Sequence, residues 1–422
     1  MDYYRIRGGK KLKGEVRISG AKNAALPVIV ASLLADGETV LKNVPDLKDI
    51  HTIIKVIEYL GAETDFDVEK NILKIRVNSI KNGEMPYELV KTMRASVYVM
   101  GPLLARLGEA DVSLPGGCAI GERPVDIHLA GFEAMGAEIQ LEHGYIKARA
   151  AKLQPAVFTM RQVSVGATAN LMMGAVLTNG KTVLENCAME PDIVDLGRFL
   201  NTMGANVSGL GTERITIEGV KKLKAVTYTI MPDRIEAGTY LLAGAITRGD
   251  VTLTNCVPEH IQSLIDTLKE SGYSIETGDN TVHIIPGKKI NGFLIKTLPY
   301  PGFPTDLQAP LMSLATTIPG ISVIIETIFE NRYTHVGELR RMGADISIEG
   351  NTAIIRGGKQ LMSAPIMMSD LRAGAALIVA SLAAKGVTEI RRIYHSDRGY
   401  ENLTEKLSAL GADIRRVKGG TF

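Results

Sequence analysis

The stretch Ser164-Val-Gly-Ala-Thr-Ala-Asn-Leu-Met-Met-Gly-Ala-Val-Leu-Thr-Asn-Gly180 decides the fold, because nearly all of it is uncharged and apolar and a glycine ends it. This pattern predicts a helix that is buried on most sides and stops at the glycine. Extended stretches over 145–149 and 157–160 precede the helix, and a buried strand begins at Thr182. A second helix over 191–203 then leads to Gly204. Strands that alternate with helices in this order predict an α/β architecture with crossover connections.

The same plan returns six times along the chain. A glycine recurs every 68 to 75 residues, followed by alanine in five of the six copies: Gly61, Gly136, Gly204, Gly272, Gly343 and Gly411. A second glycine ends the apolar helix of each copy: Gly37, Gly108, Gly180, Gly249, Gly320 and Gly386. Self-similarity at this period indicates one supersecondary unit copied along the chain. Counting back 13 to 15 residues from the second glycine gives a first-turn residue of each apolar helix: Lys22, Arg94, Gly166, Glu236, Asp306 and Arg372.

These helix starts predict an anion-binding surface. If the six helices run parallel, their first turns gather on one side, where free backbone N–H groups and the helix dipoles attract anions. The side chains of Lys22, Arg94 and Arg372 add to that attraction. Glu236 and Asp306 oppose it, which makes them candidates for a chemical role.

The length of 422 residues predicts two domains, and six units divide into three plus three. The last copy stops one strand short, and the N-terminal strands resemble those that precede every other copy. We therefore expect an N-terminal domain over 22–231 and a C-terminal domain made of 1–21 plus 232–422. Two chain crossings at one border predict a hinge, with the charged helix starts facing each other across a cleft. The first residues of the chain are expected to form an edge strand.

Charge and cysteine content exclude several classes of function. The 48 Lys and Arg residues nearly balance the 46 Asp and Glu residues, so no global field predicts binding to nucleic acid or to an anionic membrane. Three cysteines without a C-x-x-C spacing, and seven histidines without metal-ligand spacing, indicate neither a disulfide framework nor a metal site. No cofactor is expected, and a reducing cytoplasm fits. Two uncharged runs, 162–180 and 307–325, are interpreted as repeat helices rather than membrane spans.

The second copy contains a longer loop that predicts function. Its two glycines lie 28 residues apart, against 23 to 25 in the other copies, and the excess falls in Leu114-Pro-Gly-Gly-Cys-Ala-Ile-Gly-Glu-Arg-Pro124. Cys118 lies five residues before Arg123, whose charge favours a thiolate. We expect Cys118 to be a nucleophile or an acid rather than an unreactive loop cysteine. Cys187 and Cys256 occupy the place of a valine in the first copy, so we expect them in the core.

Eight segments resemble the UDP-N-acetylglucosamine enolpyruvyl transferases, in that family's order and over essentially the whole chain. They are Ser19-Gly-Ala-Lys-Asn-Ala-Ala-Leu-Pro27, Lys91-Thr-Met-Arg-Ala-Ser96, Leu114-Pro-Gly-Gly-Cys-Ala-Ile-Gly-Glu-Arg-Pro-Val-Asp-Ile-His128, Pro232-Asp-Arg-Ile-Glu236, Phe303-Pro-Thr-Asp306, Phe329-Glu-Asn-Arg332, Ser369-Asp-Leu-Arg-Ala373 and Asp397-Arg-Gly-Tyr-Glu401. The resemblance implies an inside-out α/β barrel fold, with two domains of three βαβαββ repeats each. It also implies transfer of the enolpyruvyl group of phosphoenolpyruvate to the 3-hydroxyl of UDP-N-acetylglucosamine, the first committed step of peptidoglycan precursor synthesis.

The resemblance also implies roles for individual residues. Cys118 would donate a proton to phosphoenolpyruvate, could form a covalent adduct with it, and would be the target of the inhibitor fosfomycin. Asp306 would accept the proton of the sugar hydroxyl, and Lys22, Arg398 and Asp370 complete the catalytic set. The residues expected to bind phosphoenolpyruvate are Lys22, Asn23, Arg123, Arg332, Arg372 and Arg398. Those expected to bind the nucleotide sugar are Asn23, Arg94, Arg123, Pro124, Val125, Asp126, Ile127, Val165, Gly166, Asp306 and Ile328.

One position departs from the family pattern, and two other functions stay open. Gln162 stands where the commoner pattern has lysine, so the diphosphate contact of that lysine is in doubt, with Arg161 just upstream. A shikimate enolpyruvyl transferase would share the fold and the phosphoenolpyruvate chemistry but lack the Pro-Gly-Gly-Cys loop. An inactive relative that binds UDP-sugar as a regulator would need no acid and base, so the presence of Cys118 and Asp306 argues against it.

Overall fold

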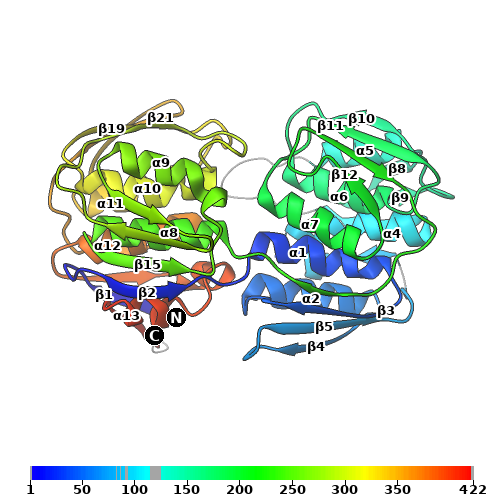
Figure 1. Cartoon of the computed structure of the whole chain (residues 1–422), viewed down its shortest axis with the longest axis horizontal. Helices are drawn as coiled ribbons and strands as arrows, with labels where there is room; N and C mark the ends of the chain where they lie inside the picture. Colours follow the sequence, from blue (N-terminus) through cyan, green and yellow to red (C-terminus); the bar gives the residue numbers. More distant parts are fainter. Residues whose placement is uncertain (1, 82, 86, 91–93, 115–124, 420–422) are drawn as a thin grey trace. The chain divides into compact units, whose positions relative to one another are not determined.

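The computed structural model describes residues 2–81, 83–85, 87–90, 94–114 and 125–419. The chain divides into two compact units (Figure 1). The N-terminal unit runs from Gly20 to Met231. The C-terminal unit combines the chain up to Ser19 with the chain from Pro232 onward.

In the part of the chain that the structure describes, the N-terminal unit contains three four-stranded sheets, ordered β14-β3-β5-β4, β6-β7-β9-β8 and β10-β11-β13-β12. The first two strands of each sheet pair in parallel and the other neighbours pair antiparallel. The strands are β3 (Gly37–Lys42), β4 (Glu63–Asp67), β5 (Ile72–Val77), β6 (Glu84–Met85), β7 (Glu109–Ser113), β8 (Glu138–Glu142), β9 (Tyr145–Arg149), β10 (Val157–Thr159), β11 (Lys181–Glu185), β12 (Asn206–Ser208), β13 (Arg214–Glu218) and β14 (Thr227–Thr229). The helices are α1 (Lys22–Ala31), η1 (Ser32–Leu34), α2 (Lys48–Tyr59), α3 (Tyr87–Val90), η2 (Arg94–Val99), α4 (Met100–Leu107), α5 (Asp126–Ala134), α6 (Val165–Ala175) and α7 (Pro191–Thr202).

The described C-terminal unit repeats this plan with the sheets β16-β17-β15-β2, β18-β19-β21-β20 and β22-β23-β1-β24. Its strands are β1 (Tyr3–Arg7), β2 (Lys13–Arg17), β15 (Asp250–Thr254), β16 (Ser274–Thr277), β17 (Thr281–Ile285), β18 (Leu294–Lys296), β19 (Gly320–Ile325), β20 (Asp345–Glu349), β21 (Thr352–Gly357), β22 (Pro365–Met367), β23 (Val387–Arg391) and β24 (Asp413–Val417). Its helices are α8 (Arg234–Ile246), η3 (Pro258–Ile261), α9 (Gln262–Glu270), α10 (Thr305–Thr317), α11 (Val336–Arg341), α12 (Leu371–Ala383), η4 (Ile393–Arg398) and α13 (Leu403–Ala409).

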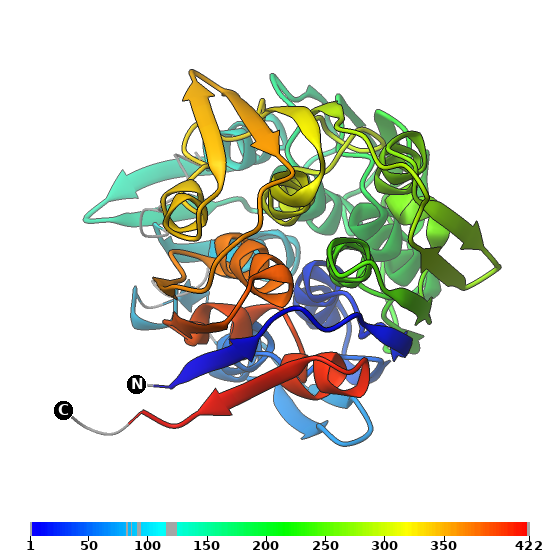
Figure 2. The same cartoon turned by 90° about the vertical axis from the view of Figure 1, so that its left-hand side faces the viewer.

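The two ends of the chain meet in one sheet. Strand β1 lies between β23 and β24, and Tyr4 is paired with Ile390 on one side and with Arg416 on the other. In Figure 2, β1 runs beside the last strand of the chain. The expectation of an edge strand at the N-terminus is therefore wrong. Alternating polar and apolar residues predict a strand with one buried face, but they do not say how many partners the strand has.

The glycine repeat marks the ends of the outer helices. Gly61 follows α2 with φ of +107°, and its N–H donates to the carbonyl oxygen of Glu58. The N–H of Ala62 donates to the carbonyl oxygen of Ile57 at 3.0 Å, which closes the last helical turn. Glycine adopts this left-handed conformation at little steric cost, because it has no Cβ atom. This explains why glycine recurs at the same point of all six copies.

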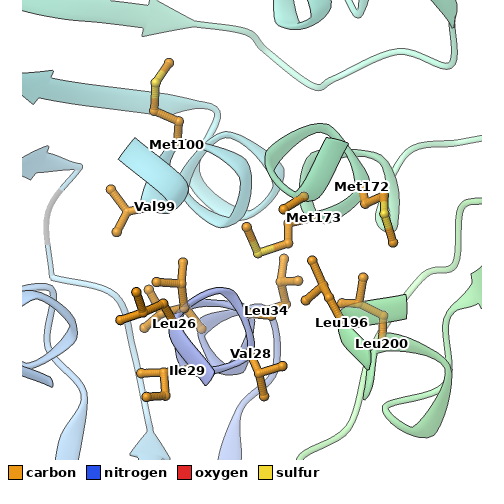
Figure 3. Close-up of a cluster of buried hydrophobic side chains, with 14 of the residues drawn as sticks. Leu26, Val28, Ile29, Leu34, Val99, Met100, Met172, Met173, Leu196 and Leu200 are labelled. Atoms are coloured by element: carbon orange, nitrogen blue, oxygen red, sulfur yellow. The ribbon is translucent and has the colours of Figure 1, made fainter. Parts of the chain in front are cut away.

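Three apolar helices form the centre of each unit. In the C-terminal unit these are α8, α10 and α12, which Figure 2 views along their axes with the strands around them. Ser313 on α10 donates a 2.7 Å hydrogen bond to the carbonyl oxygen of Ala376 on α12, so these helices pack closely. In the N-terminal unit, side chains of α1, α4, α6 and α7 interlock in a core that includes Leu26, Met173 and Leu196 (Figure 3). Full burial of one such side chain contributes about 1.5–3 kcal/mol.

The central helices begin within two residues of the predicted positions, and one of them begins as a 3₁₀ helix rather than an α-helix. Helices α1, α6, α8, α10 and α12 begin as expected from the repeat. The second copy instead begins with η2 at Arg94 and becomes α-helical at Met100.

Candidate active site

One group of candidate site residues lies in the C-terminal unit, around Asp306 in the first turn of α10. Asp306 accepts hydrogen bonds from Arg332 Nη2 at 2.5 Å and from Arg372 Nη2 at 3.0 Å. Arg332 is 4% exposed and Arg372 is 7% exposed, whereas the Asp306 side chain is 26% exposed. Arg332 also donates to the hydroxyl of Thr305 at 3.0 Å. The structure thus brings together Asp306, Arg332 and Arg372, three charged residues that the sequence analysis assigned to the site.

Two opposing effects set the charge of Asp306. Burial disfavours its ionised form, but the positive charges of Arg372 and Arg332 and their hydrogen bonds outweigh burial and hold the pKa of Asp306 well below its usual range. In this state Asp306 is an ionised, weakly basic carboxylate. Its basicity would rise if an anionic ligand took up part of the charge of the two guanidinium groups.

Two further groups hold this cluster in place. The hydroxyl of Tyr400 accepts from Arg372 Nη1 at 3.4 Å and lies 2.9 Å from the hydroxyl of Thr239 on α8. Glu326, at the end of β19, accepts from Thr305 at 2.8 Å and from the backbone N–H of Ile328 at 2.8 Å. The buried Glu326 carboxylate therefore links the start of α10 to the segment that contains Ile328, one of the residues expected to contact the sugar.

Asp370 is the N-cap of α12. Its Oδ1 accepts from the backbone N–H groups of Arg372 and Ala373, and its Oδ2 accepts from Thr334 and Ser369. Burial raises its pKa, but these hydrogen bonds act more strongly together and leave the pKa lowered. Asp370 thus fixes the helix turn that carries Arg372. Arg398 lies half-buried at the end of η4, two residues before Tyr400.

A separate group of candidate site residues lies in the N-terminal unit, at the start of α1. Lys22 is the first residue of this helix, Asn23 is the second, and no side chain caps the helix start. Backbone N–H groups in the first turn of a helix can bind an anion. Lys22 Nζ lies 3.2 Å from Oδ2 of Asp49, a buried residue in the first turn of α2. Asp49 therefore restricts the position of the Lys22 ammonium group.

The remaining predicted sugar-binding residues gather at the starts of α5 and α6. Val125 is the N-cap of α5, followed by Asp126 and the buried Ile127; Val165 and Gly166 begin α6. Asp126 forms an ion pair with Arg161, so Arg161 already has an anionic partner. A Cβ on Gly166 would lie 3.1 Å from His128 Nε2, so glycine allows α6 to approach α5 closely. The Gln162 side chain is exposed.

Some predicted residues fall outside this description. Cys118, Arg123 and Pro124 lie outside the described residues, and so does the side chain of Arg94. The predicted roles of these four residues stay predictions.

Glu236 and the other two cysteines have structural surroundings. Glu236 is 2% exposed and forms an ion pair with Lys406. Cys187 and Cys256 are each 1% exposed, as expected for core residues, and burial raises the pKa of each thiol to about 11. Among the described residues, no group of three or more His, Cys, Asp and Glu side chains could hold a metal ion. Within the same residues, every helix is too short or too polar to cross a membrane.

A cavity of about 340 Å³ lies elsewhere in the C-terminal unit. It is lined by residues at the C-terminal ends of the central helices, such as Ile246, Thr317 and Leu382. None of the predicted site residues lines it, so it is separate from the Asp306 cluster.

Comparison with known proteins identifies the family. The family model described as EPSP synthase (3-phosphoshikimate 1-carboxyvinyltransferase) matches residues 6–407. A UDP-N-acetylglucosamine 1-carboxyvinyltransferase from Geotalea uraniireducens is 54% identical over 418 residues, covering 99% of this chain and 100% of the relative. The protein of the same name from Myxococcus xanthus is 52% identical over 419 residues, with the same coverage of both chains. The chain belongs to the UDP-N-acetylglucosamine 1-carboxyvinyltransferase family.

Solved structures agree with the fold of this family. The crystal structure of the enolpyruvyl transferase NikO from Streptomyces tendae matches with a TM-score of 0.89 at 25% identity and covers 99% of both chains. An EPSP synthase from Acinetobacter baumannii matches with a TM-score of 0.78 at 18% identity, covering 99% of this chain and 100% of that one, which shows the fold alone. The two-domain enolpyruvyl transferase fold predicted from the sequence is confirmed.

For this member of the 1-carboxyvinyltransferase family, sequence reasoning missed the residues that hold the site residues in place. Asp49, Thr305, Glu326 and Tyr400 each contact a predicted site residue. A signal existed for Asp49, because an acidic residue in the first turn of the second helix also occurs in the third copy, at Asp192.

Proposed function

We propose that this chain transfers the enolpyruvyl group of phosphoenolpyruvate to the 3-hydroxyl of UDP-N-acetylglucosamine and releases phosphate. The observation that carries the proposal is the Asp306 carboxylate held between Arg332 and Arg372 in a chain 54% identical to proteins named for this reaction. A carboxylate beside two buried guanidinium groups offers a proton acceptor together with a receptor for a phosphate or carboxylate anion.

The chemistry is an addition followed by an elimination. The sugar hydroxyl loses its proton to Asp306 as its oxygen bonds to C2 of phosphoenolpyruvate, and the methylene carbon gains a proton. In the elimination, the methyl carbon formed by the addition loses a proton and the C–O bond between C2 and the phosphate group breaks. Phosphate leaves, and the enol ether remains on the sugar. Proton transfer by a positioned group contributes roughly 10²–10⁴-fold to the rate.

The two arginines link substrate binding to this chemistry. As long as Arg332 and Arg372 bind no anion other than the Asp306 carboxylate, the low pKa of Asp306 makes it a poor base. An anion of phosphoenolpyruvate that draws the guanidinium groups toward itself raises that pKa. Asp306 therefore becomes an effective base once phosphoenolpyruvate is bound, which limits the reaction to the complete complex.

Residues of the N-terminal unit supply the other groups. Lys22, with Asp49 as its partner, would bind the phosphate or carboxylate of phosphoenolpyruvate as a point charge. Cys118 would deliver the proton to the methylene carbon and react with fosfomycin. The two units would close around the substrates, and the reaction would take place in the cytoplasm. The cysteine count and the family resemblance support these finer assignments.

A phosphate-release assay tests the proposed function. We expect release that requires both UDP-N-acetylglucosamine and phosphoenolpyruvate, with each substrate omitted in turn as a control. Shikimate 3-phosphate in place of the nucleotide sugar tests the alternative acceptor, which the lower identity to EPSP synthase disfavours. Binding of UDP-N-acetylglucosamine without any phosphate release would instead favour the inactive relative.

A further inference from the structure

In the part of the chain that the structure describes, the chain passes between the two units twice, after Ser19 and after Met231. A backbone hydrogen bond lies beside each passage. In the C-terminal unit, Asp233 N–H donates to the carbonyl oxygen of Ser19 at 2.9 Å. In the N-terminal unit, Ala21 N–H donates to the carbonyl oxygen of Met231 at 2.7 Å. Any rotation of one unit against the other therefore falls on the few torsion angles between these two bonds.

Three side chains hold Ser19 within the C-terminal unit. The backbone N–H of Ser19 donates to Glu236 Oε2 at 2.6 Å, and its hydroxyl donates to Glu401 Oε2 at 2.5 Å. Lys406 Nζ donates to the Ser19 hydroxyl at 2.6 Å and to Glu236 Oε1 at 2.7 Å. The backbone N–H and the hydroxyl of Ser19 are thus held by ionisable side chains that are largely buried.

The chain continues from this fixed residue directly into close packing of the other unit. A Cβ on Gly20 would lie 1.7 Å from the carbonyl oxygen of Asn43, so only glycine fits there. Lys22 follows two residues later as the start of α1. The connection from Ser19 to Lys22 is therefore short and held at both ends.

The second passage has a carboxylate of the same kind. Asp195 on α7 accepts the backbone N–H of Met231 at 3.5 Å and the hydroxyl of Tyr228 at 2.8 Å. Ser19 and Met231 are the last residues before the two passages, and a buried carboxylate accepts the backbone N–H of each. Burial raises the pKa of Glu236 to about 7, although the charge of Lys406 opposes this change. Burial also raises the pKa of Asp195 to about 6, although the hydrogen bond from Tyr228 opposes it.

The network around Ser19 adjoins the Asp306 cluster. Glu401 follows Tyr400, whose hydroxyl accepts from Arg372. A shift of Arg372 toward a bound anion therefore acts on Tyr400, the neighbour in sequence of Glu401, which binds the Ser19 hydroxyl. The chemistry proposed above makes no use of Glu236, which is too buried to contact a substrate.

We propose that Glu236 is a positioning residue that, together with Lys406, holds Ser19 as the pivot of the first passage and thereby controls the movement of the chain there during the proposed reaction. The proposal rests on the proposed function for its kinetic consequences. Its structural part, the hold of Glu236 on the Ser19 N–H group, is independent of that function.

Glu236→Gln is the main test, because it keeps the shape of the side chain and removes its charge. We expect hydrogen exchange at the Ser19 amide to accelerate at least tenfold, without any substrate present. We expect kcat/KM for phosphoenolpyruvate to fall tenfold or more through a lower kcat and a higher KM together, as for other hinge residues. An unchanged Ser19 exchange rate, or a kcat/KM within twofold of the unmodified enzyme, would overturn the proposal.

Ser313→Ala is the matched control for lost stability, because it removes a buried hydrogen bond between α10 and α12 in the same unit. We expect it to lower the melting temperature while leaving kcat/KM within twofold at an assay temperature well below melting. An equal kinetic loss in Ser313→Ala would show a general effect of destabilisation and overturn the proposal.

A second pair of variants keeps the test decisive if Glu236→Gln does not fold. Ser19→Ala removes the bonds to Glu401 and Lys406, and Ser19→Thr restores the hydroxyl. We expect the alanine variant to lose kcat and raise KM and the threonine variant to recover most of both, and equal activity in the two variants contradicts the proposal. A failure of the unmodified enzyme to release phosphate would count against the proposed function alone, since the amide exchange of Ser19 is still measured.

Discussion

The carboxylate of Asp306 accepts a hydrogen bond from Arg372 at 3.0 Å, although 66 residues separate the two in sequence. Each residue is the second residue of a central helix, α10 for Asp306 and α12 for Arg372. The repeat therefore places equivalent points of the fifth and sixth copies in contact. A cluster of charged helix starts follows directly from copying one unit and packing its apolar helices together.

Asp306→Asn tests the base. We expect kcat to fall by two or more decades and the affinity for UDP-N-acetylglucosamine to change by less than about tenfold, because a lost base affects the transition state most. The amide also leaves Arg332 and Arg372 with a weaker partner, which costs on the order of 1–3 kcal/mol of stability. The melting temperature is measured alongside single-turnover kinetics to separate the two effects. A kcat close to that of the unmodified enzyme rejects the base role.

Cys118→Ser tests the loop thiol. We expect turnover to be abolished or severely slowed, and sensitivity to fosfomycin to be lost. Cys187 and Cys256 serve as internal controls, because burial and their raised pKa values keep them protonated and out of reach of the epoxide. Mass spectrometry of the treated protein locates the adduct. An adduct on either buried cysteine with Cys118 unmodified contradicts the prediction.

His335→Gln tests a pH effect on stability. Burial lowers the pKa of His335 from 6.5 to about 4, despite the opposing charge of Asp370. Between pH 6.5 and 4 the unfolded chain binds a proton that the folded chain does not, so the free energy of unfolding falls as the pH falls. From pH 7 to pH 5 this loss is about 2 kcal/mol.

The glutamine variant should lack this loss, because its side chain does not titrate. Urea denaturation at both pH values measures the difference. His143→Asn is the control, since His143 is exposed and asparagine tolerates its left-handed backbone. Equal pH dependence in the His335→Gln variant and the unmodified protein would reject the assignment.

The periodic features of the chain were predictable, and the contacts between distant residues were not. The regular recurrence of Gly61 and its counterparts located the helices, because the left-handed helix cap requires a glycine at the same point of every copy. Tyr400 and Glu326 leave no such mark. Their partners are set by how separate elements pack, and neither periodicity nor local spacing carries that information. The incomplete last copy did predict that the N-terminal strands join the C-terminal domain, but the alternation of polar and apolar residues in β1 did not show that the strand has a neighbour on each side.

Small-angle scattering tests closure of the two units. We expect the radius of gyration to decrease when UDP-N-acetylglucosamine is added, because the predicted ligand-binding residues are divided between the two units and substrate binding commonly closes domains. UDP alone is the control for binding to one unit. A radius of gyration that does not change on binding of the complete nucleotide sugar counts against closure.

Gln162→Lys tests the departure from the family pattern. A neutral amide in place of lysine beside a diphosphate loses a charge-assisted hydrogen bond, worth about 1.5–3 kcal/mol if nothing compensates. Arg161 is the nearest cation in sequence, but it is engaged by Asp126. We therefore expect the lysine variant to lower KM for UDP-N-acetylglucosamine by roughly tenfold while the single-turnover rate of the chemical step stays nearly unchanged.

Arg161→Gln, alone and combined with Gln162→Lys, separates the two candidate contacts. If Gln162 marks a lost contact, Arg161→Gln changes KM little and the lysine variant improves binding in either background. If Arg161 supplies the contact, by leaving Asp126 when the diphosphate arrives, Arg161→Gln alone raises KM and Gln162→Lys recovers it. An unchanged KM in the Gln162→Lys variant would mean that the lysine contact of the family is either absent here or already supplied by Arg161, and the KM of Arg161→Gln then distinguishes these two cases.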